Sequence, residues 1–187
     1  MPTAYIIAGP PGVGKSWGGH HFVSPQIDIL NHDHIALRYR NAGATDFQKI
    51  ASQQANRFLT EKLYQGLDFG LELNLGYPNH YDVIRDLRER DPFRSITLIL
   101  FYTDDVQLCL DRTLARQQAG GHSVEPSVVR EMYANTFPLL SVNQHLIDRL
   151  QPIDVNTTST EMIYSRRFSS DKPEFIHSEL PAWFKQY

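Results

Sequence analysis

The fold of this chain is decided by the stretch Ala4-Tyr5-Ile6-Ile7-Ala8-Gly9-Pro10-Pro11-Gly12-Val13-Gly14-Lys15-Ser16. Its first five residues are an apolar run typical of a buried strand. Its last eight match Gly-x4-Gly-Lys-Ser/Thr, the Walker A phosphate loop. Glycines allow successive backbone N–H groups to point into one hollow, and the helix that follows adds the positive end of its dipole. The stretch therefore predicts a triphosphate site rather than a glycine-rich turn without a ligand.

The residue types of the loop also predict individual roles. The Lys15 ammonium would reach the β and γ phosphates, and the Ser16 hydroxyl would complete the coordination of a magnesium ion. The expected cofactors are ATP or GTP together with Mg²⁺. The nucleotide-binding set comprises the whole loop: Gly9, Pro10, Pro11, Gly12, Val13, Gly14, Lys15 and Ser16.

Composition limits the class of protein. With 187 residues, 41% of them hydrophobic and 21% charged, the chain suits one domain spanning residues 1–187. A net charge of -3 argues against a general nucleic-acid or membrane-surface binder, which needs a basic field. Cys109 is the only cysteine, so no intramolecular disulfide can form. The first residues lead directly into a strand rather than a signal sequence, and no apolar run approaches the ~20 residues that span a bilayer. A cytoplasmic location is expected.

Strands and helices are predicted to alternate along the chain. The expected strands are residues 4–8, 26–30, 69–75, 95–102 and 153–155. Four helices are expected at residues 15–22, 34–40, 46–66 and 81–89. A fifth should follow the cap Thr103 and end at Gly120. Two more should run from Pro126 to about Thr136 and from after Pro138 to near Leu150. This alternation predicts an α/β fold of the P-loop NTPase type: a three-layer αβα arrangement with a central parallel five-stranded sheet and the ligand at the carboxyl ends of the strands.

Local signals refine these elements. Thr45 and Gln48 match a capping box for the helix 46–66. Pro138 is expected to kink or restart the chain. In the C-terminal extension, residues 157–187, the segments 162–168 and 174–177 could pair as a small hairpin before a helical turn over 181–186.

Polar side chains follow the expected strands at the phosphate-loop edge. Asp33 could orient the hydroxyl of a substrate and accept its proton, or it could only cap the helix that follows. Glu72 and Asn74 could contact the substrate or the magnesium ion. The alternative for Glu72 is a solvated face of an edge strand, because a buried carboxylate needs a partner.

A helical lid is expected over residues 112–136. Arg112 and Arg116 lie four residues apart on one helical face, just before the Gly120-Gly121 segment, and Arg130 follows in the next helix. Closure of such a lid would exclude water and place guanidinium charge on the γ-phosphoryl group. The alternative is a solvated helical face with neighbouring acidic residues.

Four histidines, at positions 20, 21, 32 and 34, superficially suggest a metal cluster. Adjacent histidines on a helix diverge by about 100°, and no cysteine or glutamate completes a recognised ligand spacing. We therefore predict no transition-metal site.

Taken in order, the motifs resemble those of zeta-toxin-like P-loop kinases. They are the phosphate loop, Asn31-His32-Asp33-His34, Leu71-Glu72-Leu73-Asn74, Arg112 to Arg116 with Gly120-Gly121-His122-Ser123-Val124, and Val129-Arg130-Glu131-Met132-Tyr133. The similarity runs from the N-terminus to about residue 155. It departs from the family pattern at Leu73-Asn74, where relatives carry Thr-Thr, and around Arg130.

The resemblance implies an ATP- or GTP-dependent kinase that phosphorylates a hydroxyl of a small molecule, a sugar nucleotide in the toxin members. Its implied catalytic residues are Lys15, Asp33 and Arg116, and Arg112 would join the nucleotide site. The substrate contacts that it implies are Asp33, Glu72 and Arg130, and we expect Arg38 and Asn74, from their positions near the same strand edge, to contact the substrate as well. An antitoxin-like protein partner would also fit this family. Two alternatives stay open, a nucleotide-binding regulatory module or slow ATPase and a polynucleotide kinase; net charge argues against the latter.

Overall fold

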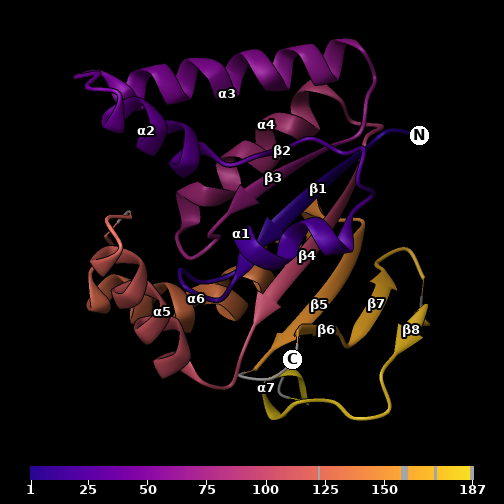
Figure 1. Ribbon diagram of the computed structural model, residues 1–187. Coiled ribbons are helices and arrows are strands. Elements are labelled where there is room, and N and C mark those ends of the chain that lie inside the picture. Colours follow the sequence, from indigo (N-terminus) through magenta and orange to yellow (C-terminus); the bar gives the residue numbers. More distant parts are fainter. Residues whose placement is uncertain (122, 157–159, 171, 186–187) are drawn as a thin grey trace.

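Five parallel strands form the centre of the sheet in the computed structural model, which describes residues 1–121, 123–156, 160–170 and 172–185 (Figure 1). Their order is β2-β3-β1-β4-β5, as expected for strands that alternate with helices. The strands are β1 (Thr3–Ala8), β2 (Ile29–Leu30), β3 (Phe69–Leu73), β4 (Ser95–Tyr102) and β5 (Arg149–Val155). Because β1 pairs with both β3 and β4, the loop that follows β1 leaves from the middle of the sheet.

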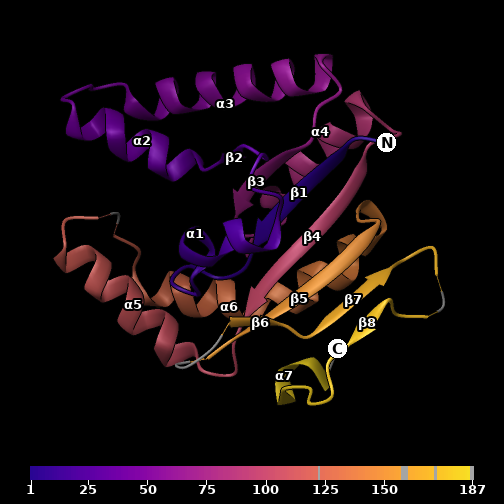
Figure 2. The ribbon, with the colours of Figure 1, turned by 45° about the vertical axis from the view of Figure 1, so that its right-hand side comes forward.

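Three antiparallel strands extend the sheet beyond β5 (Figure 2). They are β6 (Thr160–Met162), β7 (Tyr164–Arg167) and β8 (Phe175–Ile176). The predicted C-terminal hairpin is confirmed, since β7 pairs with β8. The sequence did not predict that β6 and β7 would both pair with β5. A final turn, α7 (Ala182–Lys185), packs Trp183 against Tyr102 and Phe137.

Helices lie on both faces of the sheet, but the two layers differ in depth (Figure 1). One face is covered by α4 (Asp82–Arg90) and α6 (Pro126–Asn143), which contribute Ile84, Leu87 and Leu140 to the larger hydrophobic core. On the other face, α1 (Lys15–Gly18) and the 3₁₀ turn η1 (Gly19–Phe22) lie over the strands, and Cys109 and Leu110 from the helix over residues 106–118 join its smaller core. None of the described helices combines the length and the apolar character needed to cross a membrane.

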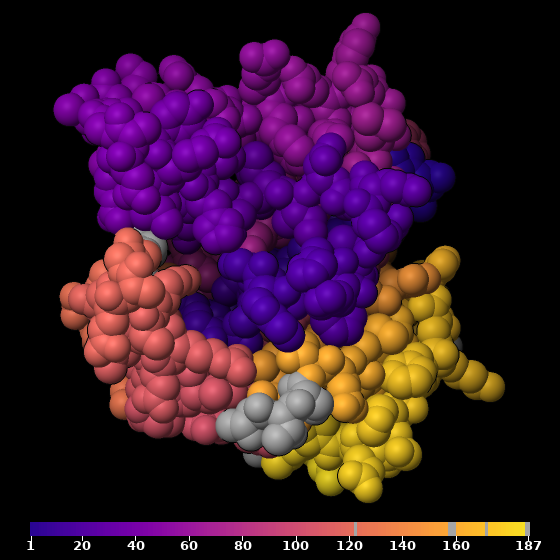
Figure 3. Space-filling model, in the orientation of Figure 1, coloured from indigo at the N-terminus to yellow at the C-terminus, as the bar shows by residue number. Residues whose placement is uncertain are grey.

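The remaining helical segments lie at different ends of the sheet. Residues of α2 (His32–Asn41), α5 (Val106–Gln118) and the 3₁₀ turn η2 (Pro78–Tyr81) line cavities at the carboxyl ends of the strands. Helix α3 (Phe47–Tyr64) packs Phe58 and Leu59 on the larger core, and the 3₁₀ turn η3 (Gln144–Leu146) directly precedes β5 at the amino edge. In the space-filling view a hollow separates α2 from the region of α5 and α6, and the phosphate loop forms its floor (Figure 3).

Several boundaries differ from the sequence prediction. The first helix is only four residues long, because Gly18 and Gly19 weaken it. β2 is limited to Ile29–Leu30, and β5 starts at Arg149 rather than at Ile153. Helix α6 ends at Asn143 and η3 at Leu146, so no helix reaches Leu150.

The predicted helix caps also need correction. Asp105, not Thr103, caps α5, because its carboxylate accepts from the N–H groups of Gln107 and Leu108. Asp46 is the N-cap residue of α3 and makes no side-chain cap bond, so the capping box at Thr45 is wrong.

Pro138 does not restart the chain as a new helix, because α6 continues through it to Asn143. Proline removes the hydrogen bond to the carbonyl four residues earlier, here that of Ala134. Since Ala134 is exposed, water can satisfy this carbonyl and the helix continues.

Candidate active site

The phosphate loop adopts a conformation that only glycine permits. Gly9 has φ +142° and Gly12 has φ +81°, both in the left-handed half of backbone space. A Cβ atom would lie 2.2 Å from the Phe101 carbonyl oxygen at Gly9 and 2.2 Å from the Cys109 carbonyl oxygen at Gly12. Gly14 immediately precedes α1, so the loop ends at a helix N-terminus. This geometry suits phosphate binding by backbone N–H groups.

Lys15 lies at the centre of the site. Its Nζ donates to the carbonyl oxygens of Gly9 at 2.7 Å and Pro10 at 3.0 Å, and to Asn74 Oδ1 at 2.9 Å. Burial lowers the pKa of this ammonium to about 8, opposed by the nearby carboxylate of Glu72. The lysine thus keeps its charge at neutral pH in a position where phosphate oxygens could replace the carbonyl oxygens.

Ser16 and Glu72 form the candidate magnesium position. Ser16 Oγ donates to Glu72 Oε1 at 2.6 Å, and Asn31 Nδ2 lies 3.5 Å from the same hydroxyl. Glu72 comes from β3, which lies inside the sheet between β2 and β1, so the edge-strand alternative for this residue is wrong. Hydroxyl and carboxylate oxygens are ligands that Mg²⁺ prefers. The described residues therefore fit this ion, although among them no group of three or more His, Cys, Asp or Glu side chains is arranged to hold a metal.

Asp33 is not the cap of its helix. The cap of α2 is Asn31, whose side chain accepts from the His34 N–H at 3.0 Å, and the helix already begins at His32. Asp33 therefore lies in the first turn with its exposed carboxylate lining the same cavity as Lys15. Within the described part of the chain, no hydrogen bond or ion pair occupies this carboxylate, so it can bind a substrate.

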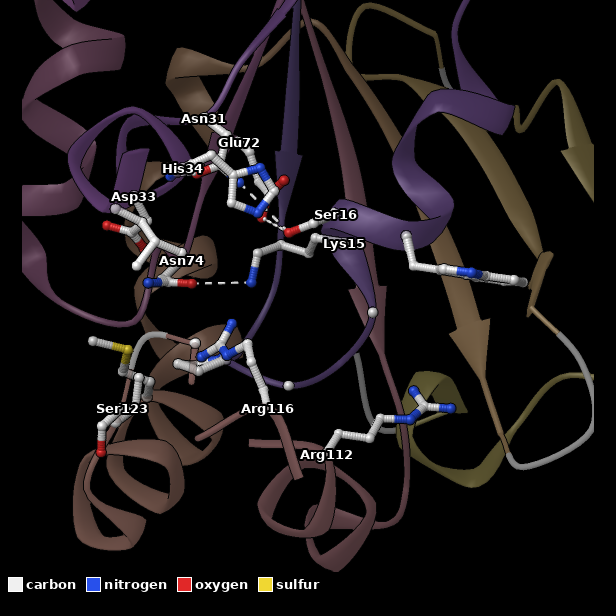
Figure 4. Close-up of a pocket in the computed structure, with 18 of the residues that line it drawn as sticks. Lys15, Ser16, Asn31, Asp33, His34, Glu72, Asn74, Arg112, Arg116 and Ser123 are labelled. Carbon is white, nitrogen blue, oxygen red and sulfur yellow. Dashed lines mark hydrogen bonds between the residues drawn. The ribbon is translucent and has the colours of Figure 1, made fainter. Parts of the chain in front are cut away.

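The two lid arginines have different surroundings (Figure 4). Arg116 points towards Lys15, whereas Arg112 points away from it. Nη1 of Arg112 donates to the Val13 carbonyl oxygen at 3.2 Å, which ties α5 to the phosphate loop. Arg116 is exposed, and its charge contributes to the lowered pKa of Lys15. This arrangement favours Arg116 as the residue that reaches a terminal phosphate.

Two other predicted substrate contacts lie elsewhere. Arg38 is exposed on α2, with its guanidinium carbon 5.2 Å from the centre of the Tyr39 ring. Arg130 is exposed on α6. Neither lines the cavities at the strand ends, so their roles stay predictions. His122 of the predicted lid pattern lies outside the described residues.

Two adjoining cavities occupy this edge of the sheet. The larger, of about 740 Å³, extends from the phosphate loop to Asp33 and is bounded by α2, α5 and α6. The smaller, of about 290 Å³, lies beside Lys15 and reaches η2. We call the loop Gly9–Ser16 with Arg112 and Arg116 the phosphate-loop side. The carboxylate side is the opposite group: Asp33, Glu72, Asn74, Asn79 and His80.

Sequence reasoning missed several cavity residues. Trp17 is 75% exposed and lines the larger cavity; its place directly after the phosphate loop was the available signal. His80 lines the smaller cavity, and burial lowers the pKa of its ring. Its buried Nδ1 has no hydrogen-bond partner among the described residues. Only its position after β3 could have indicated His80. Leu37, Val124, Val128 and Met132 supply apolar walls and carried no recognisable motif signal.

Comparison with known proteins identifies the fold. No protein-family model and no curated protein sequence matches the chain. Among solved structures, the AvrRxo1-ORF1:AvrRxo1-ORF2 complex with sulphate ions is 15% identical with a TM-score of 0.66, covering 93% of this chain and 61% of that chain. The same complex with ATP gives 15% identity and a TM-score of 0.62 over 88% of this chain and 58% of that chain. This chain therefore spans about three fifths of those chains.

Two further solved structures share the architecture. A chain of the PezAT chromosomal toxin-antitoxin system of Streptococcus pneumoniae is 17% identical, with a TM-score of 0.66 over 100% of this chain and 82% of that chain. A chain of the Pnkp1/Rnl/Hen1 RNA repair complex is 15% identical, with a TM-score of 0.60 over 76% of this chain and 46% of that chain. At these identities the likeness concerns the fold. The predicted P-loop fold is confirmed, and it is shared with a chain of a toxin-antitoxin system.

Proposed function

We propose that the protein is a kinase that uses ATP or GTP with magnesium to phosphorylate a hydroxyl of a small molecule. One observation supports this more than any other: the phosphate-loop lysine and the unpaired carboxylate of Asp33 line one cavity from opposite sides. A nucleotide-binding module requires the first group but has no use for the second. Phosphoryl transfer requires both, because the attacking hydroxyl must be oriented and must lose its proton.

The phosphate-loop side would bind and polarise the triphosphate. Backbone N–H groups of the loop and the Lys15 ammonium would hold the β and γ phosphates, and Arg116 would stabilise charge on the migrating group. A magnesium ion held through Ser16, with Glu72 behind it, would neutralise phosphate charge when bound. The segment of α5 and α6 that contains these arginines would act as a lid over residues 112–136.

The carboxylate side would prepare the acceptor. A hydroxyl oxygen bonded to Asp33 would attack the γ-phosphorus while the bond to the β-γ bridging oxygen breaks, and the hydroxyl proton would pass to the carboxylate. The resemblance to zeta toxins implies a sugar nucleotide as one candidate acceptor. An antitoxin-like partner is a related proposal, supported by the printed description of PezAT as a toxin-antitoxin system.

A labelling experiment tests the activity. The protein would be incubated with γ-labelled ATP and a metabolite extract, and labelled products would be separated and identified. We expect a labelled product with the wild type, none with Lys15→Ala, and about 10²-fold less with Asp33→Asn. Release of labelled phosphate without a labelled metabolite would instead favour a slow ATPase. Labelling of added RNA or DNA ends alone would favour a polynucleotide kinase.

A further inference from the structure

The charges around the two cavities restrict the chemical class of the acceptor. We propose that the acceptor is a hydroxyl compound without a phosphate or other anionic group, such as a free sugar, a polyol or an amino alcohol. This inference rests on the proposed kinase activity, since it describes the second substrate of that reaction. It differs from the sugar nucleotide that the sequence resemblance implies.

The basic side chains are confined to the phosphate-loop side. Among the described residues that line the two cavities, the lysines and arginines are Lys15, Arg112 and Arg116. The first donates to loop carbonyl oxygens and the second donates to Val13. The third points at Lys15 (Figure 4). A triphosphate bound on the loop would occupy Lys15 and Arg116, and Arg112 already donates to the Val13 carbonyl oxygen, so the three offer no separate site for a second anion.

Carboxylates dominate the opposite side of the cavities. Asp33 and Glu72 approach from α2 and β3, and Glu125 lines the larger cavity where α6 begins. An acceptor phosphate in this space would be repelled by Asp33, by Glu125 at the start of α6 and by the γ-phosphate next to it, even with Glu72 paired with a magnesium ion. Hydroxyl and ammonium groups are donors, and carboxylates bind them well.

The other polar groups of the smaller cavity are compatible with a neutral ligand. Asn74 and Asn79 supply amide groups, which bond hydroxyls without adding charge. Burial and the charge of Lys15 lower the pKa of the His80 ring, against a smaller opposite effect of Asp33, and so disfavour its charged form. These side chains can therefore recognise a pattern of hydroxyls and give an anion no counter-charge.

The two arginines that could have bound an acceptor phosphate lie outside this space. Arg38 is exposed on α2 beside Tyr39, and Arg130 is exposed on α6. Neither lines either cavity.

Enzymatic removal of phosphate from the acceptor pool tests this proposal directly. A metabolite extract would be treated with immobilised phosphodiesterase and alkaline phosphatase, the enzymes would be removed, and transfer from γ-labelled ATP would be measured before and after treatment. We expect acceptor activity to survive within about twofold, and the acceptor to pass unbound through an anion-exchange column. Loss of more than nine tenths of the activity on treatment would overturn the inference while leaving the kinase activity intact. No labelled product from either extract would reject the kinase proposal itself.

Variants of the cavity wall give an independent readout. Asn79 is exposed on η2 and takes no part in the proposed phosphoryl transfer. Asn79→Arg would place a cation in the acceptor cavity, and we expect it to raise labelling of the anion-exchange-bound fraction at least fivefold relative to the unbound fraction. Asn79→Gln controls for side-chain size, and Asn41→Arg adds the same charge at an exposed position outside the cavities. An unchanged preference in Asn79→Arg would contradict the electrostatic argument.

Discussion

The phosphate-loop side and the carboxylate side of the site are built on different principles. The first is held by backbone: glycines without room for a Cβ, carbonyl oxygens that bind Lys15, and a helix N-terminus. The second consists of side chains that leave three different elements and are mostly not bonded to one another. The backbone geometry of the loop restricts which residues can occupy its positions, whereas each side chain of the carboxylate side can be substituted without altering the others. The first side therefore defines the fold class, and in the proposed function the second would determine the substrate.

The largest expected effect lies on the phosphate-loop side. Lys15→Ala should abolish the stabilisation of the protein by Mg-ATP, because it removes the charge that would hold the β and γ phosphates. A thermal-shift titration measures this, with Asn79→Gln as a control that should keep the full shift. Equal stabilisation of Lys15→Ala and wild type would show that the loop does not bind phosphate.

Asp33 separates chemistry from nucleotide binding. Asp33→Asn should lower turnover by roughly 10²-fold or more, the usual scale for loss of a general base, while ATP affinity stays within a few-fold. Steady-state kinetics and a binding titration on the same variant provide the two numbers. If ATP affinity falls as much as the turnover rate, Asp33 takes part in magnesium binding instead, and it would have to be assigned to the phosphate-loop side.

Arg116 and Arg112 test the arrangement of the lid. Arg116→Ala should reduce the maximal rate roughly 10-fold to 10²-fold with little change in the Michaelis constant for ATP, because its charge would act mainly in the transition state. Lysine at this position should restore the rate only partly, since an ammonium cannot make a two-pronged contact. Arg112→Ala is the matched comparison. A lower rate in Arg112→Ala alone would reverse the two assignments, and no change in either would leave α5 as a solvated face.

The pKa of Lys15 predicts a pH dependence confined to the phosphate-loop side. Burial lowers this pKa to about 8, so the ammonium loses its proton above that pH. ATP affinity of the free protein should then fall about tenfold between pH 7 and pH 9. The stability of the ligand-free protein changes in the opposite direction. Between about pH 8 and pH 10.5, the folded and ordinary pKa values of Lys15, the unfolded chain binds more protons than the folded one, so Lys15 makes the free energy of unfolding rise with pH. Calorimetric titrations at several pH values would measure the first effect, and an affinity independent of pH over this range would contradict it.

The smallest effect concerns Trp17. This side chain is 75% exposed at the larger cavity, where the base or ribose of a nucleotide bound on the loop could cover its indole. Trp17→Ala should weaken ATP binding about fivefold and leave the binding of inorganic tripolyphosphate unchanged. Nucleotide should also quench tryptophan emission in the wild type but not in Trp17→Phe, because Trp183 is only 5% exposed. Identical losses for both ligands would place Trp17 at the phosphates instead.

The phosphate-loop side could be predicted from the sequence more completely than the carboxylate side. The apolar runs of β1 and β4 and the spacing of the loop glycines determined the fold class, since burial and positive φ angles leave few alternatives. Strand ends then placed Asp33, Glu72 and Asn74 at one edge correctly. Their partners could not be predicted: the bond between Ser16 and Glu72 joins residues 56 positions apart, and its geometry depends on strand register.

Errors in local structure arose where tertiary context outweighed propensity. Pro138 was expected to kink or restart the chain, but α6 continues through it because the helix packs on the sheet and Ala134, four residues earlier, is exposed to water. Thr45 and Thr103 were expected to cap helices that begin elsewhere because other residues fit those turns. The edge of β5 has unpaired backbone N–H and C=O groups that any later extended segment could bind. No local sequence pattern predicts that β6 and β7 are the segments that pair there.

The parallel direction of the central strands has a practical consequence for handling this protein. Because all five strands point towards the phosphate loop, the amino end of β1 emerges at the opposite edge of the sheet, where Met1 is 88% exposed (Figure 2). An affinity tag, a fluorophore or a linker to a sensor surface attached before Met1 would therefore leave the nucleotide cavity facing bulk solvent. Immobilised protein in this orientation would suit surface-based titrations with nucleotides and candidate acceptors.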